Sequence, residues 1–152
     1  MSSLIALTVF FLLSFAAALF GAQFPPGDWY AQLEKPSWNP PNWVFAPVWT
    51  ILYAAMAVAA WLVWREGTSE RRAPLAFWTL QLVLNALWSW IFFGLHRPGW
   101  AAIEIGLLWI AILATTILFF RVRRVAGALL LPYLAWVSFA AVLNVALWWL
   151  NR

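Results

Sequence analysis

The sequence predicts an all-α integral membrane protein, built as a bundle of five transmembrane helices. Hydrophobic residues make up 66% of the 152 residues and charged residues only 9%, whereas a soluble globule is about 45–50% apolar and about 25% charged. The apolar residues gather in five runs, each close to the roughly 20 residues that a helix needs to cross about 30 Å of hydrocarbon. The alternation typical of β-barrel strands is not seen. The single domain, 1–152, has its helices at about 4–23, 44–64, 74–95, 100–120 and 127–150.

The first run is interpreted as a membrane helix, with a signal peptide as the alternative. Its apolar core from Leu4 to Phe20 has no Lys or Arg ahead of it and exceeds the usual ~7–15 residues of a signal peptide. Ala16-Ala17-Ala18 resembles a cleavage site, but the length favours the membrane helix. Small residues four apart in this run, such as Ala17 and Gly21, permit close helix approach, either within the bundle or in a homodimer.

The first loop, residues 24–43, is predicted to form a rigid lid over one end of the bundle. Its sequence FPPGDWYAQLEKPSWNPPNW contains five prolines, which stiffen the backbone. Its aromatic residues, Phe24, Trp29, Tyr30, Trp38 and Trp43, need packing partners. The alternative is an aromatic belt at the membrane surface. We favour the lid because a belt does not need five prolines.

The distribution of basic residues predicts the orientation of the chain in the membrane. The second and fourth loops carry six basic residues and the opposite side three, so the positive-inside rule places the N-terminus and loops two and four in the cytoplasm. The lid and the C-terminus then lie on the opposite side. The formal net charge is +4, but the charges sit between apolar runs, so no nucleic-acid partner is expected. The six basic residues of loops two and four are Arg65, Arg71, Arg72, Arg121, Arg123 and Arg124, and the three on the opposite side are Lys35, Arg97 and Arg152.

Three helices carry a stripe that mixes aromatic and hydrogen-bonding side chains. Spacings of three and four residues place each stripe on one helix face. One interpretation is a central apolar pocket with a few polar anchors, and the other is hydrogen bonding between neighbouring helices. The sequence leaves both open. The stripes are Trp49, Tyr53, Met56 and Ala60; Gln81, Asn85 and Ser89, with Trp88 beside them; and Tyr133, Trp136, Ala140 and Asn144.

The residues for polar catalysis or metal binding are few. The chain has no Cys and one His, His96, so no metal site is expected. Glu104 lies in the first turns of the fourth helix, where we favour a carboxylate that snorkels or pairs with the positive helix end. No acid–base pair or activated nucleophile is visible, so an enzyme is the less favoured class.

Three stretches resemble the translocator protein / tryptophan-rich sensory protein family, TspO/MBR, formerly the peripheral benzodiazepine receptors. They are WYAQLEKPSWNPPNWVFAPVWTILY at 29–53, QLVLNALWSWIFFG at 81–94 and LPYLAWVSFAAVLN at 131–144. The resemblance covers nearly the whole chain. It implies a five-helix bundle, usually a homodimer, that acts as a receptor, sensor or carrier and binds porphyrins, sterols and isoquinoline- or benzodiazepine-type ligands. We expect a bacterial member in an envelope membrane.

The resemblance also implies a ligand site beneath the lid. The expected ligand is a porphyrin or heme-type tetrapyrrole, without an obligatory cofactor or metal, and its carboxylates are expected to meet Lys35 or Arg97 at the mouth. Alternatives are light-dependent porphyrin breakdown, with Trp49 and Trp136 as the only catalytic candidates, and sterol or lipid transport. Val145 follows Asn144 where animal members have a Tyr, which argues against sterol recognition there. The ligand-binding residues carried over by motif position are Trp38, Trp49, Tyr53, Asn85, Trp88, Trp136, Ala140 and Leu143.

Overall fold

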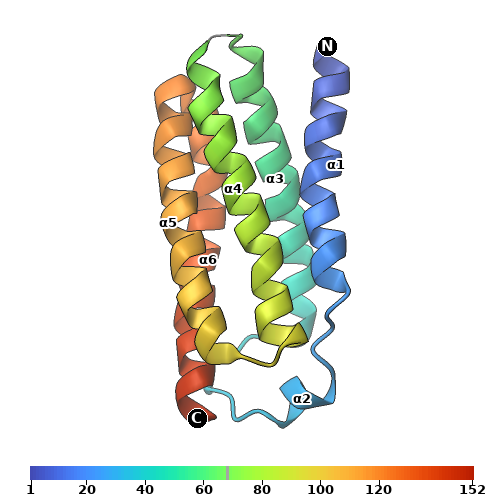
Figure 1. Ribbon diagram of the computed structural model, residues 1–152, viewed down its shortest axis with the longest axis vertical. Helices are drawn as coiled ribbons and strands as arrows, with labels where there is room; N and C mark the ends of the chain where they lie inside the picture. The colour runs from blue at the N-terminus through green and yellow to red at the C-terminus, as the bar shows by residue number, and fades with distance from the viewer. Residues whose placement is uncertain (68) are drawn as a thin grey trace.

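The computed structural model describes residues 1–67 and 69–152, in which five long helices run side by side (Figure 1). Together with the short turns that adjoin two of them, all five are long and apolar enough to cross a bilayer. No strand occurs among the described residues. The predicted all-α fold class is therefore confirmed, and the protein is an integral membrane protein. The long helices are α1 (Ser3–Ala22), α3 (Phe45–Arg65), α4 (Arg72–Ser89), α5 (Pro98–Val122) and α6 (Arg124–Leu150).

Short elements lie between the long helices. The lid contains the helix α2 (Gly27–Gln32) and ends in the 3-10 turn η1 (Asn42–Val44), which leads directly into α3. A second 3-10 turn, η2 (Ser69–Arg71), precedes α4, and a π turn, η3 (Trp90–Gly94), follows it. The lid crosses one end of the bundle, where the C-terminus of α6 also lies (Figure 1).

The third predicted helix, 74–95, is not a continuous α-helix. After Ser89 the backbone widens into η3, where the amide of Leu95 donates to the carbonyl of Trp90 at 2.8 Å, five residues back. A π turn adds one residue to a helical turn and so changes the direction of the side chains that follow it. Apolar periodicity predicts a helix here but does not distinguish a π turn from an α turn.

The five long helices form a closed ring in which α1 packs on α3, α3 on α6, α6 on α5, α5 on α4, and α4 on α1. Met56 of α3, Trp78 of α4 and Tyr133 of α6 are almost fully buried within it. The helix α1 contributes buried Ala6, Phe10 and Ala17, so the first apolar run belongs to the bundle.

Gly21 of α1 explains part of the small-residue pattern. A Cβ atom at Gly21 would lie 3.1 Å from Oγ of Ser89 in α4 of the same chain. Glycine therefore allows α1 and α4 to approach closely. Gly21 serves packing inside the bundle, while association of two copies remains a prediction.

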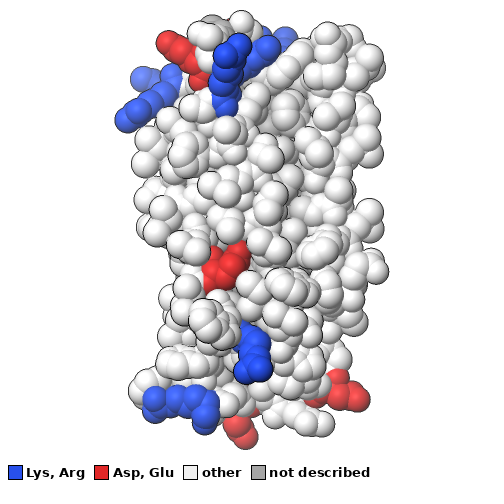
Figure 2. All heavy atoms as spheres, viewed as in Figure 1, with Lys and Arg blue, Asp and Glu red and all other residues white. Residues whose placement is uncertain are grey.

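Charged residues lie toward the two ends of the bundle, and one acidic group lies between them on the face drawn in Figure 2. Among the residues that the structure describes, Arg123 and Glu66 form a salt bridge, with 3.5 Å between Nη1 and Oε1. The apolar middle band is the surface that faces lipid.

Candidate functional site

An aromatic cluster joins α3, α6 and the lid. We call these rings the mouth cluster. Trp49 and Tyr53 lie one turn apart on α3, with 5.5 Å between ring centroids, and Trp49 meets Tyr133 of α6 edge-on at 6.2 Å. Farther toward the lid, Trp136 lies 5.9 Å from Phe45 and 5.5 Å from Phe139, and Phe139 lies 5.8 Å from Trp38. The mouth cluster consists of Trp38, Phe45, Trp49, Tyr53, Tyr133, Trp136 and Phe139.

A chain of hydrogen bonds lies beneath the mouth cluster and connects three helices. The hydroxyl of Tyr53 donates to Oδ1 of Asn85 at 2.5 Å, and Nδ2 of Asn85 donates to the hydroxyl of Tyr133 at 2.8 Å. That hydroxyl in turn donates to Oε1 of Gln81 at 2.7 Å. All four residues are buried. Hydrogen bonding between helices, one of the two interpretations left open by the stripes, therefore applies to Asn85 and Gln81.

Trp88 is held by a second polar contact. Its indole N–H donates to Oδ1 of Asn144 at 2.8 Å, and Nδ2 of Asn144 donates to the carbonyl of Pro98 at 2.9 Å. Asn144 thus ties α4 to the start of α5. The π turn adds two rings to Trp88: Phe92 stacks on it at 5.0 Å and Phe93 meets it edge-on at 5.7 Å.

The lid is fixed to the bundle by side chains at both of its flanks. Trp29 of α2 stacks on His96 with 4.3 Å between centroids and 5° between planes. Asn151, just beyond α6, accepts from the amide of Glu34 at 2.8 Å and donates to its carbonyl at 2.9 Å. Tyr30 is buried under α2, and this burial raises the pKa of its phenol, which stays neutral near pH 7.

Lys35 is occupied within the lid itself. Its Nζ donates to the carbonyls of Tyr30 at 2.7 Å and Leu33 at 3.1 Å, where α2 ends. An ammonium group near the last carbonyls of a helix satisfies groups that otherwise have no partner. Arg97, the other cation expected at the mouth, has an exposed side chain.

The structure brings most of the candidate ligand residues together. Trp38, Trp49, Tyr53 and Trp136 belong to the mouth cluster, and Asn85 lies directly beneath it. Trp88 and Leu143 pack instead against the neighbouring group of Tyr30, Phe92 and Leu147, while Ala140 lies on α6 one turn from Trp136. In exposure, Tyr53, Asn85 and Leu143 are buried, Trp49, Trp88, Trp136 and Ala140 are half-buried, and Trp38 is 46% exposed.

Sequence reasoning missed Phe45 and Phe139 as parts of the mouth. Phe45 lies four residues before Trp49, and Phe139 three residues after Trp136, so helical spacing already places each beside a chosen Trp. That spacing was the available signal. Their contacts with Trp136 show that both shape the space beneath the lid.

The indole N–H of Trp136 is the unusual polar group of the mouth cluster. It is buried and has no hydrogen-bond partner, although a buried Trp N–H usually finds one. The rings around it belong to Phe45 and Phe139. The mouth cluster therefore holds a buried donor without a partner, on a ring that packs against two other aromatic rings.

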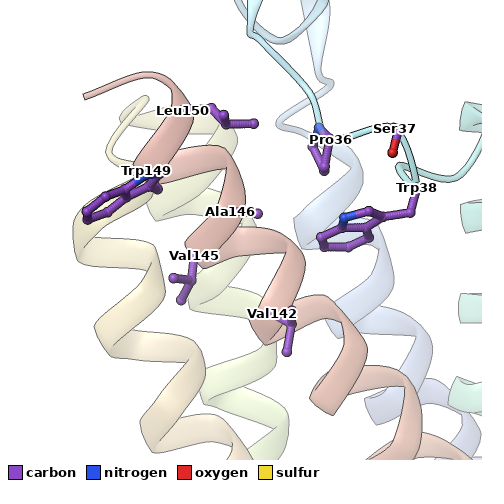
Figure 3. A pocket seen from close by; sticks show the side chains of 8 residues that line it. All are labelled: Pro36, Ser37, Trp38, Val142, Val145, Ala146, Trp149 and Leu150. Carbon is purple, nitrogen blue, oxygen red and sulfur yellow. The ribbon is translucent and has the colours of Figure 1, made fainter.

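Two hollows lie on the outer surface rather than in the bundle interior. The first, about 510 Å³, separates the lid from α6, and Trp38 and Pro36 face Val142 and Ala146 across it (Figure 3). The second, about 490 Å³, lies over Gly106, Trp109 and Ser138. The residue stripes of the sequence suggest a central pocket, but at that place the aromatic rings of the mouth cluster are in contact with one another. An occupant of the interior would have to move some of them.

The sequence model of the TspO/MBR family matches residues 5–150 of this chain. The chain belongs to the TspO/MBR family. It is 42% identical to Protein CrtK of Rhodobacter capsulatus over 151 residues, which cover 98% of this chain and 94% of that protein.

Other TspO/MBR proteins are similarly close. The human translocator protein is 46% identical over 134 residues, 84% of this chain and 79% of that protein. The tryptophan-rich sensory protein of Cereibacter sphaeroides is 42% identical over 130 residues, 85% of this chain and 80% of that protein. Membership of this family of membrane proteins supports a sensor or receptor role.

Proposed function

We propose that this TspO/MBR protein is a membrane receptor, sensor or carrier that binds a tetrapyrrole, such as a porphyrin or heme precursor, beneath the lid. The proposed site lies between α3 and α6, against Trp49 and Trp136. Other flat apolar molecules of similar size belong to the same ligand class. The tetrapyrrole is a ligand here, and no resident cofactor is part of the proposal.

The observation that carries the proposal is the unpartnered indole N–H of Trp136 among aromatic rings. Leaving a buried donor without an acceptor costs about 1–3 kcal/mol. A ligand that brings an acceptor to this N–H recovers that cost, and its flat faces bury against the rings. The half-buried state of Trp49 and Trp136 supports a site that a ligand completes.

Ligand entry requires rearrangement at the mouth. Phe45, Phe139 and Trp38 fill the space between Trp136 and the lid, so a ligand must displace at least one ring. The lid is held to the bundle by side-chain contacts, among them the stack of Trp29 on His96 and the hydrogen bonds of Asn151 to Glu34, and local opening of such a segment admits a ligand without unfolding the bundle. We therefore place lid opening before ligand binding.

The experiment is a protoporphyrin IX titration of the purified protein, followed by the change in porphyrin absorbance. Trp136→Phe retains a ring and removes the N–H, and we expect it to weaken binding about tenfold, as for one hydrogen bond of about 1.4 kcal/mol. Trp100→Phe is the matched control because Trp100 is 66% exposed on α5. Its binding should equal that of the unmodified chain.

Two outcomes would contradict the proposal. Absorbance changes that never saturate would mean that the porphyrin partitions into detergent. Equal affinity of the Trp136→Phe variant and the unmodified chain would place the ligand elsewhere. Size-exclusion chromatography with light scattering on the same sample tests the accompanying expectation that two copies associate.

A further inference from the structure

Glu104 is a buried carboxyl group that the proposed site does not yet use. It lies on α5, six residues or about 9 Å past the first residue, Pro98, and only 7% of it is exposed. Its neighbours on the helix face, Ala101, Ile105 and Leu108, are buried and apolar.

Neither carboxyl oxygen of Glu104 has a hydrogen-bond partner, although both are buried. The sequence favoured a carboxylate that snorkels or pairs with the start of the helix. The structure does not fit that expectation, because Glu104 lies beyond the first turn, where the free amides are. Ionisable groups inside a membrane are costly unless they are paired, and they mark functional positions.

Two hydrogen bonds between α5 and α6 locate Glu104 along the bundle. Asn144 reaches Pro98 at 2.9 Å, and Trp109 donates to Ser138 at 2.8 Å. Glu104 lies between Pro98 and Trp109 on α5, so it is level with the segment of α6 from 138 to 144. That segment carries Ala140 and Leu143, two of the candidate ligand residues.

Trp88 lies at the same level on α4. It bonds to Asn144, the residue that marks one end of the α6 segment level with Glu104. A carboxyl group without a hydrogen-bond partner thus lies at the same depth in the bundle as Trp88, Ala140 and Leu143. The basic residues visible in Figure 2 lie toward the ends of the bundle, and no side chain among the described residues bonds to Glu104, so its carboxyl group is open to a ligand.

We infer that Glu104 is a specificity-determining residue, which forms a hydrogen bond with a carboxyl group of the ligand by sharing one proton with it. This inference rests on the proposed function. The N–H groups of a porphyrin point into the centre of the ring, so the donors at its edge are its carboxylic acids. A carboxylic acid and a carboxylate form a short, charge-assisted O–H···O⁻ hydrogen bond, with one proton between the two groups.

Two probes separate this hydrogen bond from the rest of binding. Protoporphyrin IX carries two carboxylic acids, and its dimethyl ester has the same ring and no O–H donor. The unmodified protein should bind the diacid at least tenfold more tightly than the diester. Glu104→Met, unbranched and of similar length, should reduce this preference to less than threefold with little change in diester affinity.

Three variants serve as controls. Glu104→Gln keeps a neutral group that both accepts and donates, and should retain most of the preference. Glu70→Gln removes an exposed acid from η2, at the far end of the bundle, and should retain all of it. Arg97→Gln removes the exposed cation near the mouth and tests the alternative that the carboxylic acids bind there, which predicts that this variant, and not Glu104→Met, loses the preference. If Glu104→Met does not fold, Glu104→Asp withdraws the carboxyl group by one methylene and should lower the preference instead.

The outcomes that overturn the inference are distinct. Equal weakening of both probes by Glu104→Met would mean that Glu104 only supports packing. An unchanged preference in Glu104→Met, or its loss only in Arg97→Gln, would place the carboxylic acids at the mouth. Saturable binding of both probes without any preference in the unmodified chain would also reject Glu104 while leaving the proposed function intact. If neither probe binds saturably, the proposed function and this inference fail together.

Discussion

Trp29 of α2 and His96 of the turn between α4 and α5 stack face to face, with 4.3 Å between their ring centroids and 5° between the ring planes. His96 also has a positive φ of 54°, which is uncommon for a residue other than glycine. The contact joins the lid to the segment that follows the π turn. A strained backbone that persists at a contact of this kind indicates that the surrounding packing holds it.

Loss of this stack should loosen the lid. We expect His96→Ala to lower the free energy of lid opening by about 0.5–1.5 kcal/mol, the usual worth of an aromatic pair. Hydrogen exchange of the α2 amides should therefore accelerate about two- to tenfold, while exchange in the middle of α5 stays unchanged. His96→Phe keeps a flat ring at this position and is the control. If both variants exchange as the unmodified chain does, the stack does not hold the lid.

Asn151 should act on the lid from the opposite flank. Its side chain makes two hydrogen bonds to the backbone of Glu34, and a typical hydrogen bond contributes about 0.5–1.5 kcal/mol. We expect Asn151→Ala to raise the dissociation rate of a bound porphyrin about tenfold or more, measured by stopped-flow exchange into excess lipid vesicles. Asn42→Ala changes an exposed Asn of the same loop and should leave the rate unchanged. Equal rates in all three proteins would show that the lid does not limit release.

The hydrogen-bond chain beneath the mouth cluster should stabilise the bundle. Asn85→Leu removes both bonds of Asn85 and leaves the hydroxyl of Tyr53 buried without an acceptor. Hydrogen bonds between membrane helices average about 0.6 kcal/mol. Because this change also leaves a buried hydroxyl without an acceptor, we expect a larger loss of about 1–3 kcal/mol in the free energy of unfolding. Unfolding in detergent with increasing denaturant measures this loss.

The matched control for Asn85 is Thr79→Val on the same helix. The hydroxyl of Thr79 donates to the carbonyl of Leu75 in its own helix, and Thr79 is exposed. The free energy of unfolding of the Thr79→Val variant should therefore change little. Tyr53→Phe combined with Asn85→Leu should cost less than the sum of the two single changes, because the residues share one bond. Strict additivity would contradict a direct contact between them.

Much of this arrangement can be read from the sequence, because helix length and helix face depend on local pattern. Five apolar runs predict five spans, and spacings of three and four place Tyr53, Asn85 and Tyr133 on the inner faces of three helices. The contacts among these three residues follow once the helices are packed. The dense Trp and Pro pattern of the lid likewise identifies the family.

The remaining features depend on distances that periodicity does not encode. Asn151 and Glu34 are 117 residues apart in the chain, and Asn151 lies outside the three stretches that carry the family resemblance. Asn144 bonds to a backbone carbonyl, that of Pro98, which no side-chain pattern predicts. Lys35 looks available to a ligand until the end of α2 places three carbonyls around it.

The orientation in the membrane can be tested directly because the chain contains no Cys. Single cysteines at Ser37, in the lid, and at Glu70, in η2, would lie at exposed positions on opposite ends of the bundle. The six arginines at the η2 end against three basic residues at the lid end predict that the η2 end is cytoplasmic. A membrane-impermeant maleimide should therefore label Ser37→Cys in intact spheroplasts and label Glu70→Cys only after they are permeabilised. The reverse pattern would place the lid, and with it the route of ligand entry, on the cytoplasmic side. Labelling of both sites in intact spheroplasts would mean that the chain inserts in two orientations, as a charge difference of only three residues can permit.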